Sequence, residues 1–265
     1  MADSTSIQPI VLNTSDLHIG YTGKSGDKKI AGPLNLNLKR GELVCLIGKN
    51  GIGKSTLLRT LSKMQAPLDG KIEIDLQDLD QLSHAALAHK ISLVLTERIP
   101  NSNLRVEELI ALGRQPYTNW IGKLSDQDLK EINEAVKESH LEDLLGQKCN
   151  ELSDGQLQRA MICRALAQKT DLIILDEPTA HLDIQHKIET FQLLKKIAHQ
   201  LGRGVLISTH EIQLALQMSD SIWMMLENEM ITERPHKLIS SDKINLLFDS
   251  NSISFDKESC QFIVK

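Results

Sequence analysis

The sequence predicts an α/β protein with a parallel β-sheet core, an antiparallel β-subdomain at the N-terminus and a helical subdomain inserted into the middle of the chain. Three observations predict this fold class. Short apolar runs recur along the chain with helical patterns between them, which is typical of a parallel sheet. Residues 10–47 alternate apolar and polar positions around a loop near 20–29, which is typical of antiparallel strands. Residues 104–169 show helical periodicity and no convincing strand.

Buried strands and one helix can be assigned from these patterns. Residues 43–47 form a short, continuous apolar run, as expected of a strand that is buried on both faces of a sheet. A helix is expected over 55–64 and should stop before Pro67, because proline disfavours helical backbone in the residue before it. Four further runs are predicted to be buried strands: 91–95, 172–176, 205–208 and 222–226.

The central segment carries the pattern of amphipathic helices. Ser125 is predicted to begin a helix that has Leu129, Ile132 and Val136 on one face and acidic residues on the other. The expected division of the chain is 10–96 and 170–235 for the α/β core with its β-subdomain, 97–169 for the helical subdomain, and 236–265 for a weakly patterned C-terminal extension without an assigned function.

Composition and charge narrow the classes of function. The net charge is −5, and a strongly basic face, the usual feature of a nucleic-acid binder, is not predicted. The cysteines lack metal-ligand spacing, and Cys45 and Cys163 lie in apolar runs, so we expect small buried side chains in a reducing compartment. No apolar run approaches the roughly 18 residues that span a bilayer, and the first residues lack the layout of a signal peptide. Any membrane role should therefore depend on a partner protein.

The segment from Gly48 to Thr56 matches G-x-x-x-x-G-K-[ST], the pattern of a phosphate-binding loop, between a predicted strand and a predicted helix. Its glycines let backbone N–H groups turn toward phosphate oxygens, and the helix N-terminus adds a partial positive charge. Lys54 supplies a charge for the outer phosphates, and the Ser55 hydroxyl can ligate Mg²⁺. The alternative is a flexible glycine-rich turn. The pattern predicts a bound nucleotide and Mg²⁺, and by itself it fits kinases, GTPases and many ATPases. The predicted contacts are Gly48, Asn50, Gly51, Gly53, Lys54, Ser55 and Thr56.

Two carboxylates follow the strand predicted at 172–176. Asp176 ends the strand and is suited to hold the Mg²⁺ shell. Glu177 follows directly, where a general base could polarise the attacking water. Taken alone, this pattern would also fit a strand that ends in an acidic turn.

Residues 152–156, Leu-Ser-Asp-Gly-Gln, precede a helical run at 157–168. Ser153 and Gln156 by themselves fit a plain capping box. However, Ser153 lies 23 residues before Asp176, which is the order and spacing that ABC ATPases show. With the phosphate loop and the two carboxylates, these residues make the chain resemble an ABC ATPase, a P-loop NTPase with a RecA-like core, over about residues 10–235.

The resemblance implies further site residues. In this family two subunits face each other head to tail, and ATP lies between the phosphate loop of one and the signature helix of the other. The signature normally reads Leu-Ser-Gly-Gly-Gln, so Asp154 is a departure, as are Ala180 and His181 in the D-loop, and these departures bear on nucleotide affinity and hydrolysis rate. The implied residues are Tyr21 against adenine, Ser153, Gly155 and Gln156 in the signature, Asp183 in the D-loop, and His210 as the sensor of the γ-phosphate.

Residues 108–117 resemble a stretch in importers of iron–siderophore complexes, haem and cobalamin, although a surface helix ended by Gly113 and Pro116 is the alternative. The resemblance implies an ATP-hydrolysing motor at the cytoplasmic face of the cell membrane. Its implied partners are an integral-membrane permease that contacts the helical subdomain near Arg114 and Tyr117, a second copy of the chain and, indirectly, a periplasmic or extracellular substrate-binding protein. Two alternatives stay open: a soluble ABC ATPase without a transport role, as in iron–sulfur assembly, and a nucleotide-gated regulatory subunit.

Glu97 is the last candidate site residue. The family usually carries a glutamine after the strand predicted at 91–95, and its amide oxygen reaches Mg²⁺. No glutamine occurs between Gln81 and Gln115 in this sequence. We therefore predict that the Glu97 carboxylate replaces the amide and that the metal ligands are Ser55, Asp176 and Glu97. The alternative is an exposed loop acid.

Overall fold

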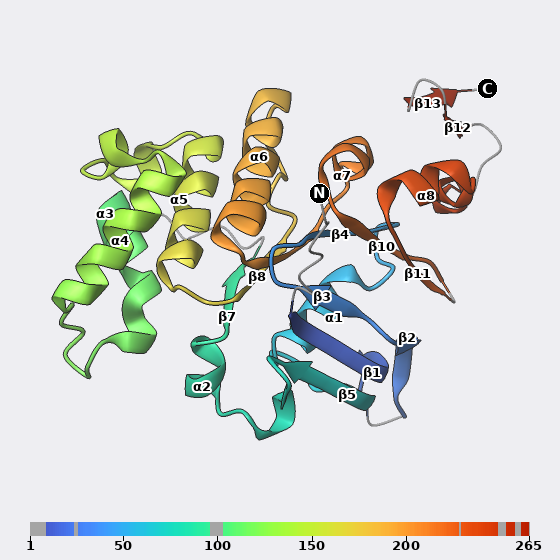
Figure 1. Cartoon of the computed structure of the whole chain (residues 1–265), viewed down its shortest axis with the longest axis horizontal. Helices are drawn as coiled ribbons and strands as arrows, with labels where there is room; N and C mark the ends of the chain where they lie inside the picture. Colours follow the sequence, from blue (N-terminus) through green and yellow to red (C-terminus); the bar gives the residue numbers. More distant parts are fainter. Residues whose placement is uncertain are drawn as a thin grey trace, which may run out of the picture.

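The structure is a computed structural model that describes residues 9–23, 26–95, 103–227, 229–248, 253–257 and 261–264. It contains a six-stranded sheet, a smaller antiparallel sheet and a group of helices beyond one edge of the larger sheet (Figure 1). These are the parts that the sequence predicts, so the predicted fold class is confirmed.

The six-stranded sheet forms the centre of the molecule, in the order β11-β10-β4-β9-β8-β7. Pairing is parallel from β10 through β7, and β11 runs antiparallel to β10. The predicted buried strands are confirmed, with ends that shift by one residue or less, whereas β11 was not predicted. The strands are β4 (Leu43–Gly48), β7 (Ile91–Val94), β8 (Leu172–Asp176), β9 (Gly204–Ser208), β10 (Ser221–Met225) and β11 (Met230–Glu233).

Apolar side chains on the two faces of this sheet enter two separate cores. In β4, Leu43, Cys45 and Ile47 face a core that includes α6 (Ile184–Leu201), α7 (Ile212–Met218) and the helices within 106–167. Val44 and Leu46 face a second core, shared with α1 (Lys54–Leu61) and the antiparallel sheet. Burial on both faces explains why this strand is apolar without alternation. Cys45 and Cys163 are buried as predicted, and burial raises the pKa of each thiol to about 12.

The antiparallel sheet is built around one long strand, β1, which pairs with β2, β3 and β5. The strands predicted within 10–47 are confirmed. The sequence prediction missed β5 and β6, because β5 begins with Asp69 and Gly70, residue types that are depleted in strands. The strands are β1 (Ile10–Tyr21), β2 (Lys28–Leu34), β3 (Asn37–Lys39), β5 (Asp69–Ile74) and β6 (Gln77–Asp78).

Helices cover both faces of the central sheet. Helix α1 ends earlier than the predicted residue 64, because Lys63 adopts a left-handed backbone (φ 60°) and donates its ammonium to the carbonyls of Leu79 and Leu82. The helices around the sheets are α1 (Lys54–Leu61), α2 (His84–Ala88), α6 (Ile184–Leu201), α7 (Ile212–Met218) and the 3₁₀ turn η1 (Leu79–Gln81).

The helical segment lies at one end of the molecule, drawn in green and yellow in Figure 1. As predicted, Ser125 begins α4, in a capping box with Asp128. Ile132 and Val136 are buried, but Leu129 is 47% exposed and the acidic Asp128 is buried, so the predicted division into an apolar face and an acidic face is wrong at these two positions. The segment consists of α3 (Val106–Ala111), α4 (Asp126–Ser139), α5 (Asp154–Ala167) and the 3₁₀ turns η2 (Leu112–Tyr117), η3 (Glu142–Leu144) and η4 (Cys149–Glu151).

The exposure of Leu129 has a simple cause. The buried stripe of α4 is centred on Asp128, Ile132 and Ala135, about a quarter turn from Leu129 at roughly 100° per residue. Asp128 occupies the stripe because it pairs with the buried Arg114. An acidic residue therefore lies where an apolar pattern predicts a leucine.

The C-terminal residues form a small structure of their own, at the end of the molecule opposite the helical segment (Figure 1). It comprises α8 (Pro235–Ser240), the 3₁₀ turn η5 (Lys243–Leu247) and a hairpin of β12 (Ile253–Asp256) and β13 (Gln261–Val264). The ring of Phe262 meets those of Phe248 and Phe255 edge to face, at centroid distances of 5.0 and 5.1 Å. Across the described part of the chain, no helix is both long and apolar enough to cross a membrane.

Candidate active site

The phosphate loop joins β4 to α1 and has the backbone that its glycines predict. Gly51 and Gly53 have φ values of 75° and 119°, a region that favours glycine. At Gly53 space is limiting as well, because an added Cβ would lie 2.3 Å from Cγ2 of Ile30. The strand before the loop and the helix after it are therefore joined by a turn that larger residues would distort.

Lys54 is the first residue of α1, and its side chain folds back into the loop. It is 5% exposed, and its Nζ donates to the carbonyls of Gly48 at 2.9 Å and Lys49 at 3.1 Å. Burial lowers the pKa of the Lys54 amine, while the nearby carboxylates of Glu177 and Asp176 act in the opposite direction. A buried ammonium whose hydrogen-bond partners, among the residues that the structure describes, are neutral carbonyls is suited to an anionic ligand.

Tyr21 connects the antiparallel sheet to the same loop. Its hydroxyl and Oγ1 of Thr56 share a hydrogen bond of 2.8 Å, while the side chain stays 47% exposed. Thr56 is buried, whereas Asn50 is exposed and Ser55 is partly exposed. An exposed aromatic ring is thus anchored beside the phosphate loop, where a flat base could stack on it.

The two carboxylates lie at the end of β8, as predicted. Asp176 is buried and its Oδ1 accepts a 2.6 Å hydrogen bond from the Ser208 hydroxyl. Glu177 has a φ of 49°, uncommon for a residue with a side chain, and its Oε1 lies 2.5 Å from Nε2 of His210. The structure therefore brings together the candidate base and the candidate γ-phosphate sensor.

Ser208 is a site residue that the sequence analysis missed. Its Oγ accepts from the Glu177 N–H at 2.9 Å while it donates to Asp176, so one hydroxyl fixes both acidic residues. Ser208 ends β9, which pairs with β8 so that Ser208 lies opposite Asp176. The only sequence signal is a polar residue at the end of an apolar strand. This signal identifies Ser208 as a site residue only when β8 and β9 are known to be neighbours in the sheet.

The signature residues lie at the start of α5. Ser153 and Gln156 form the capping box that the sequence also allows, with Ser153 Oγ accepting from the Gln156 N–H at 3.2 Å. Asp154 is exposed, and Gly155 is buried against the ring of His186 on α6. Asp183 caps α6 by accepting from the His186 N–H at 2.9 Å. In this single chain these residues form a group around the starts of α5 and α6.

The permease was expected to meet the helical subdomain near Arg114 and Tyr117, but the Arg114 side chain itself is buried and does not face a partner. It is 3% exposed, its Nε donates to Asp128 at 2.9 Å, and its Nη1 donates to the Ala167 carbonyl at 2.9 Å. Its guanidinium lies 3.7 Å from the ring centroid of Tyr117. Arg114 therefore holds α4, α5 and η2 together. Glu97 lies outside the described residues.

Comparisons with known proteins decide the family. The sequence pattern of the ABC transporter family matches residues 31–180, a range that includes the phosphate loop, the signature and both carboxylates. The chain belongs to the ABC transporter family. Members of this family bind nucleotide and hydrolyse ATP to power transport.

Three similar proteins extend the comparison. The petrobactin import ATP-binding protein YclP of Bacillus subtilis is 34% identical over 84% of this chain and 88% of its own length. The iron(3+)-hydroxamate import ATP-binding protein FhuC of the same organism is 34% identical over 84% of this chain and 81% of its own. The dimeric structure of the bacterial ABC transporter cassette MJ0796 superposes with a TM-score of 0.71 at 29% identity, covering 84% of this chain and 98% of that one.

Proposed function

We propose that this ABC ATPase is the motor subunit of an importer for iron–siderophore complexes, haem or cobalamin. The observation that supports it most is that relatives named for petrobactin and iron(3+)-hydroxamate import match 84% of the chain. Iron–siderophore complexes are therefore the first cargo to test. The subunit would work at the cytoplasmic face of the membrane, with a substrate-binding protein acting on the other side.

The nucleotide phosphates would bind in the loop after β4. Lys54 would exchange its bonds to the Gly48 and Lys49 carbonyls for bonds to phosphate oxygens, a stronger pairing of opposite charges. The loop amides and the N-terminus of α1 would bind the remaining oxygens, and Tyr21 would stack on the base. This arrangement uses only groups that already line the loop.

The donor atoms beside the loop fit Mg²⁺. They are hard oxygens, the Ser55 hydroxyl and the Asp176 carboxylate, which this cation prefers. The Ser208 bond to Oδ1 orients the Asp176 carboxylate and leaves Oδ2 as a ligand atom. Mg²⁺ bound there would offset the charge of the phosphates, with Glu97 as the proposed further ligand.

Glu177 would act as the general base. The oxygen of a water forms a bond to the γ-phosphorus, the bond from the γ-phosphorus to the bridging oxygen breaks, and the Glu177 carboxylate takes the proton of that water. Two features support this role: the backbone φ of 49° turns Glu177 away from the strand, and the 2.5 Å contact with His210 orients its side chain. His210 would exchange part of this contact for the γ-phosphate once ATP is bound.

A second copy of the chain would complete the site. Ser153, Gly155 and Gln156 lie at the start of a fourteen-residue helix, whose N–H groups and positive dipole end favour an anion. In a head-to-tail pair they would face the γ-phosphate on the other subunit, together with Asp183. The dimeric MJ0796 cassette, with the same overall fold, supports this assembly.

The permease would dock on the helical segment beside α2. A groove of about 460 Å³ lies there, lined by α2, η2 and the end of α5. Leu112 and Pro116 line this groove, and Leu112 is 48% exposed, so the site offers apolar surface to a partner. The division into a core of 10–96 and 170–235 and a helical subdomain of 97–169 is part of the same proposal, and a groove lined by residues from both ranges supports it.

Uptake of labelled iron chelates tests the proposal. Cells that lack this chain should lose import of at least one ferric siderophore, and haem and cobalamin are the further substrates to assay. The wild-type gene should restore import, and Lys54→Ala should not, because the phosphates lose their buried cation. Normal uptake of every substrate in the deleted cells would favour the soluble, non-transport alternative.

A further inference from the structure

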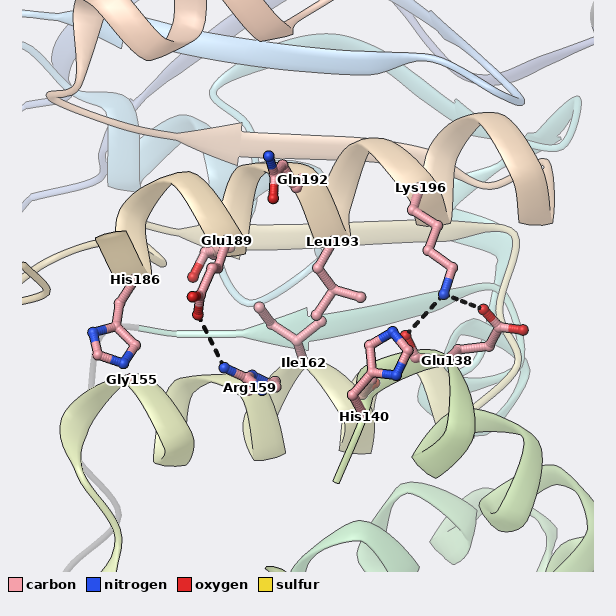
Figure 2. Close-up of a pocket in the computed structure, with 12 residues that line it drawn as sticks. Glu138, His140, Gly155, Arg159, Ile162, His186, Glu189, Gln192, Leu193 and Lys196 are labelled. Atoms are coloured by element: carbon pink, nitrogen blue, oxygen red, sulfur yellow. Dashed lines mark hydrogen bonds and ion pairs between the residues drawn. The ribbon is translucent and has the colours of Figure 1, made fainter. Parts of the chain in front are cut away.

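His186 on α6 contacts two segments that the proposed sandwich places at its interface. Its Nδ1 lies 2.7 Å from Oδ2 of Asp183, the last residue of the D-loop, whose other carboxylate oxygen accepts from the His186 N–H at 2.9 Å. On its other side the ring lies against Gly155 of the signature. Figure 2 shows His186 directly above Gly155, at one end of the groove between α5 and α6.

The contact with Gly155 explains why that position carries glycine. Gly155 is not among the residues with positive φ, so its backbone alone would accept any helix-forming residue. A Cβ there would lie 2.4 Å from Cδ2 and 2.7 Å from Cγ of His186, far closer than such atoms approach. The imidazole therefore occupies the space of a side chain at position 155, and α5 and α6 are in backbone-to-ring contact at this point.

The bond with Asp183 fixes the other edge of the ring. Hydrogen bonds from the backbone N–H and then the imidazole of His186 hold the pKa of the Asp183 carboxyl below its usual range, so Asp183 is an acceptor. Nδ1 must then carry the proton, and the ring cannot rotate without losing this bond. The D-loop and the signature helix are thus connected through one side chain.

We propose that His186 is a positioning residue that holds the D-loop and the signature helix in one fixed arrangement, so that Asp183 and Gly155 meet the nucleotide of the second subunit together. This inference rests on the proposed function, because it concerns the ATP-bound pair. His186 acts through its two neighbours and itself touches no nucleotide.

The same groove supplies a matched control. Lys196 also lies on α6 and also connects it to the helical segment, with Nζ 2.9 Å from Oε2 of Glu138 (Figure 2). It lines the far end of the groove of about 310 Å³ and contacts neither the D-loop nor the signature. Lys196→Gln therefore removes an ion pair between α6 and the helical segment and leaves the contacts of His186 unchanged.

The first test measures ATP-dependent pairing in a Glu177→Gln background, by analytical ultracentrifugation. We expect His186→Ala to raise the dissociation constant of the ATP-bound dimer by about tenfold, because the D-loop and the signature helix are no longer held together and must be ordered when the pair forms. Fluorescent ATP should bind the monomer as in the parent, and Lys196→Gln should dimerise as the parent does. His186→Asn, whose amide can still donate to Asp183, should dimerise more tightly than His186→Ala.

Three results would overturn the proposal: equal dimerisation in His186→Ala and Lys196→Gln, weaker nucleotide binding by the His186→Ala monomer, or no advantage of His186→Asn over His186→Ala. If the parent itself binds ATP but forms no dimer, the sandwich of the proposed function fails. In that case thermal unfolding, which needs no nucleotide, still tests the contact between His186 and Gly155.

The second test uses thermal unfolding of the free chain. Gly155→Ala should lower Tm in the wild-type background, because the new methyl group meets the imidazole. In the His186→Ala background the same substitution should raise Tm, because the space is open and alanine favours a helix over glycine. The sign of the Gly155→Ala effect should therefore reverse, and the same sign in both backgrounds would show that the ring does not hold α5.

Discussion

Arg114 gives the sharpest test of the packing. Arg114 and Asp128 form a buried ion pair, with side chains that are 4% and 5% exposed and a 2.9 Å contact. Arg114→Met preserves most of the volume but leaves the Asp128 carboxylate buried without its cation. Removal of one partner from a buried pair costs about 3–5 kcal/mol. For a chain of this size we expect Tm to fall by roughly 6–20 °C.

Urea unfolding, followed by far-UV circular dichroism without nucleotide, measures the cost of Arg114→Met. The double variant Arg114→Met with Asp128→Asn should recover more than half of the lost stability. No unpaired charge remains in it, and the amide oxygen at position 128 can still accept the hydrogen bond from the Ser125 N–H. Lys130→Ala is the control, since its pair with Glu134 is exposed and should contribute less than about 1 kcal/mol. A loss below about 1 kcal/mol for Arg114→Met would refute the reasoning.

Four further outcomes are expected. Glu177→Gln should lower phosphate release about a hundredfold or more and should pair in ATP but not in ADP; unchanged turnover would exclude Glu177 as the base. Ser208→Ala should lower kcat about tenfold with little change in the KM for ATP, because the Asp176 carboxylate and the backbone N–H of Glu177 lose their shared partner; an unaltered kcat would show that these hydrogen bonds do not affect hydrolysis. The Mg²⁺ concentration that gives half-maximal ATPase activity should shift in Glu97→Ala and much less in Glu97→Gln. Superimposed titration curves would show that Glu97 is not a metal ligand. Hydrogen bonds from Ser125 first, and then the Arg114 guanidinium, lower the pKa of Asp128. The stability that its carboxylate contributes is therefore present above the unfolded pKa of about 3.9 and is lost as the pH falls further. In urea unfolding measured against pH, Asp128→Asn should reduce the loss of stability at acidic pH.

The parts that the sequence predicted best are those that depend on local chemistry. The strands at 172–176 and 43–47 could be predicted because a strand buried on both faces must be apolar throughout. The phosphate loop and the capping box of Ser153 with Gln156 could be predicted because each motif is contained within a few consecutive residues.

The parts that the sequence did not predict depend on pairs that meet only in the fold. Ser208 and Asp176 are neighbours through strand pairing, and no pattern along the chain links them. Arg114 was expected near a permease because residues 108–117 resemble a stretch in importers, and its burial depends on Asp128 fourteen residues later. His186 and Gly155 belong to different helices, and a glycine in helical conformation gives no sign that a ring occupies its missing side chain.

The central position of β4 has a consequence for how the protein is made. β4 leads into the phosphate loop, yet its two neighbours in the sheet, β9 and β10, are synthesised more than 150 residues later. A ribosome-bound chain that ends before residue 204 therefore presents β4 with both edges unpaired. The strand that leads into the phosphate loop therefore gains its sheet neighbours only after most of the chain has been synthesised.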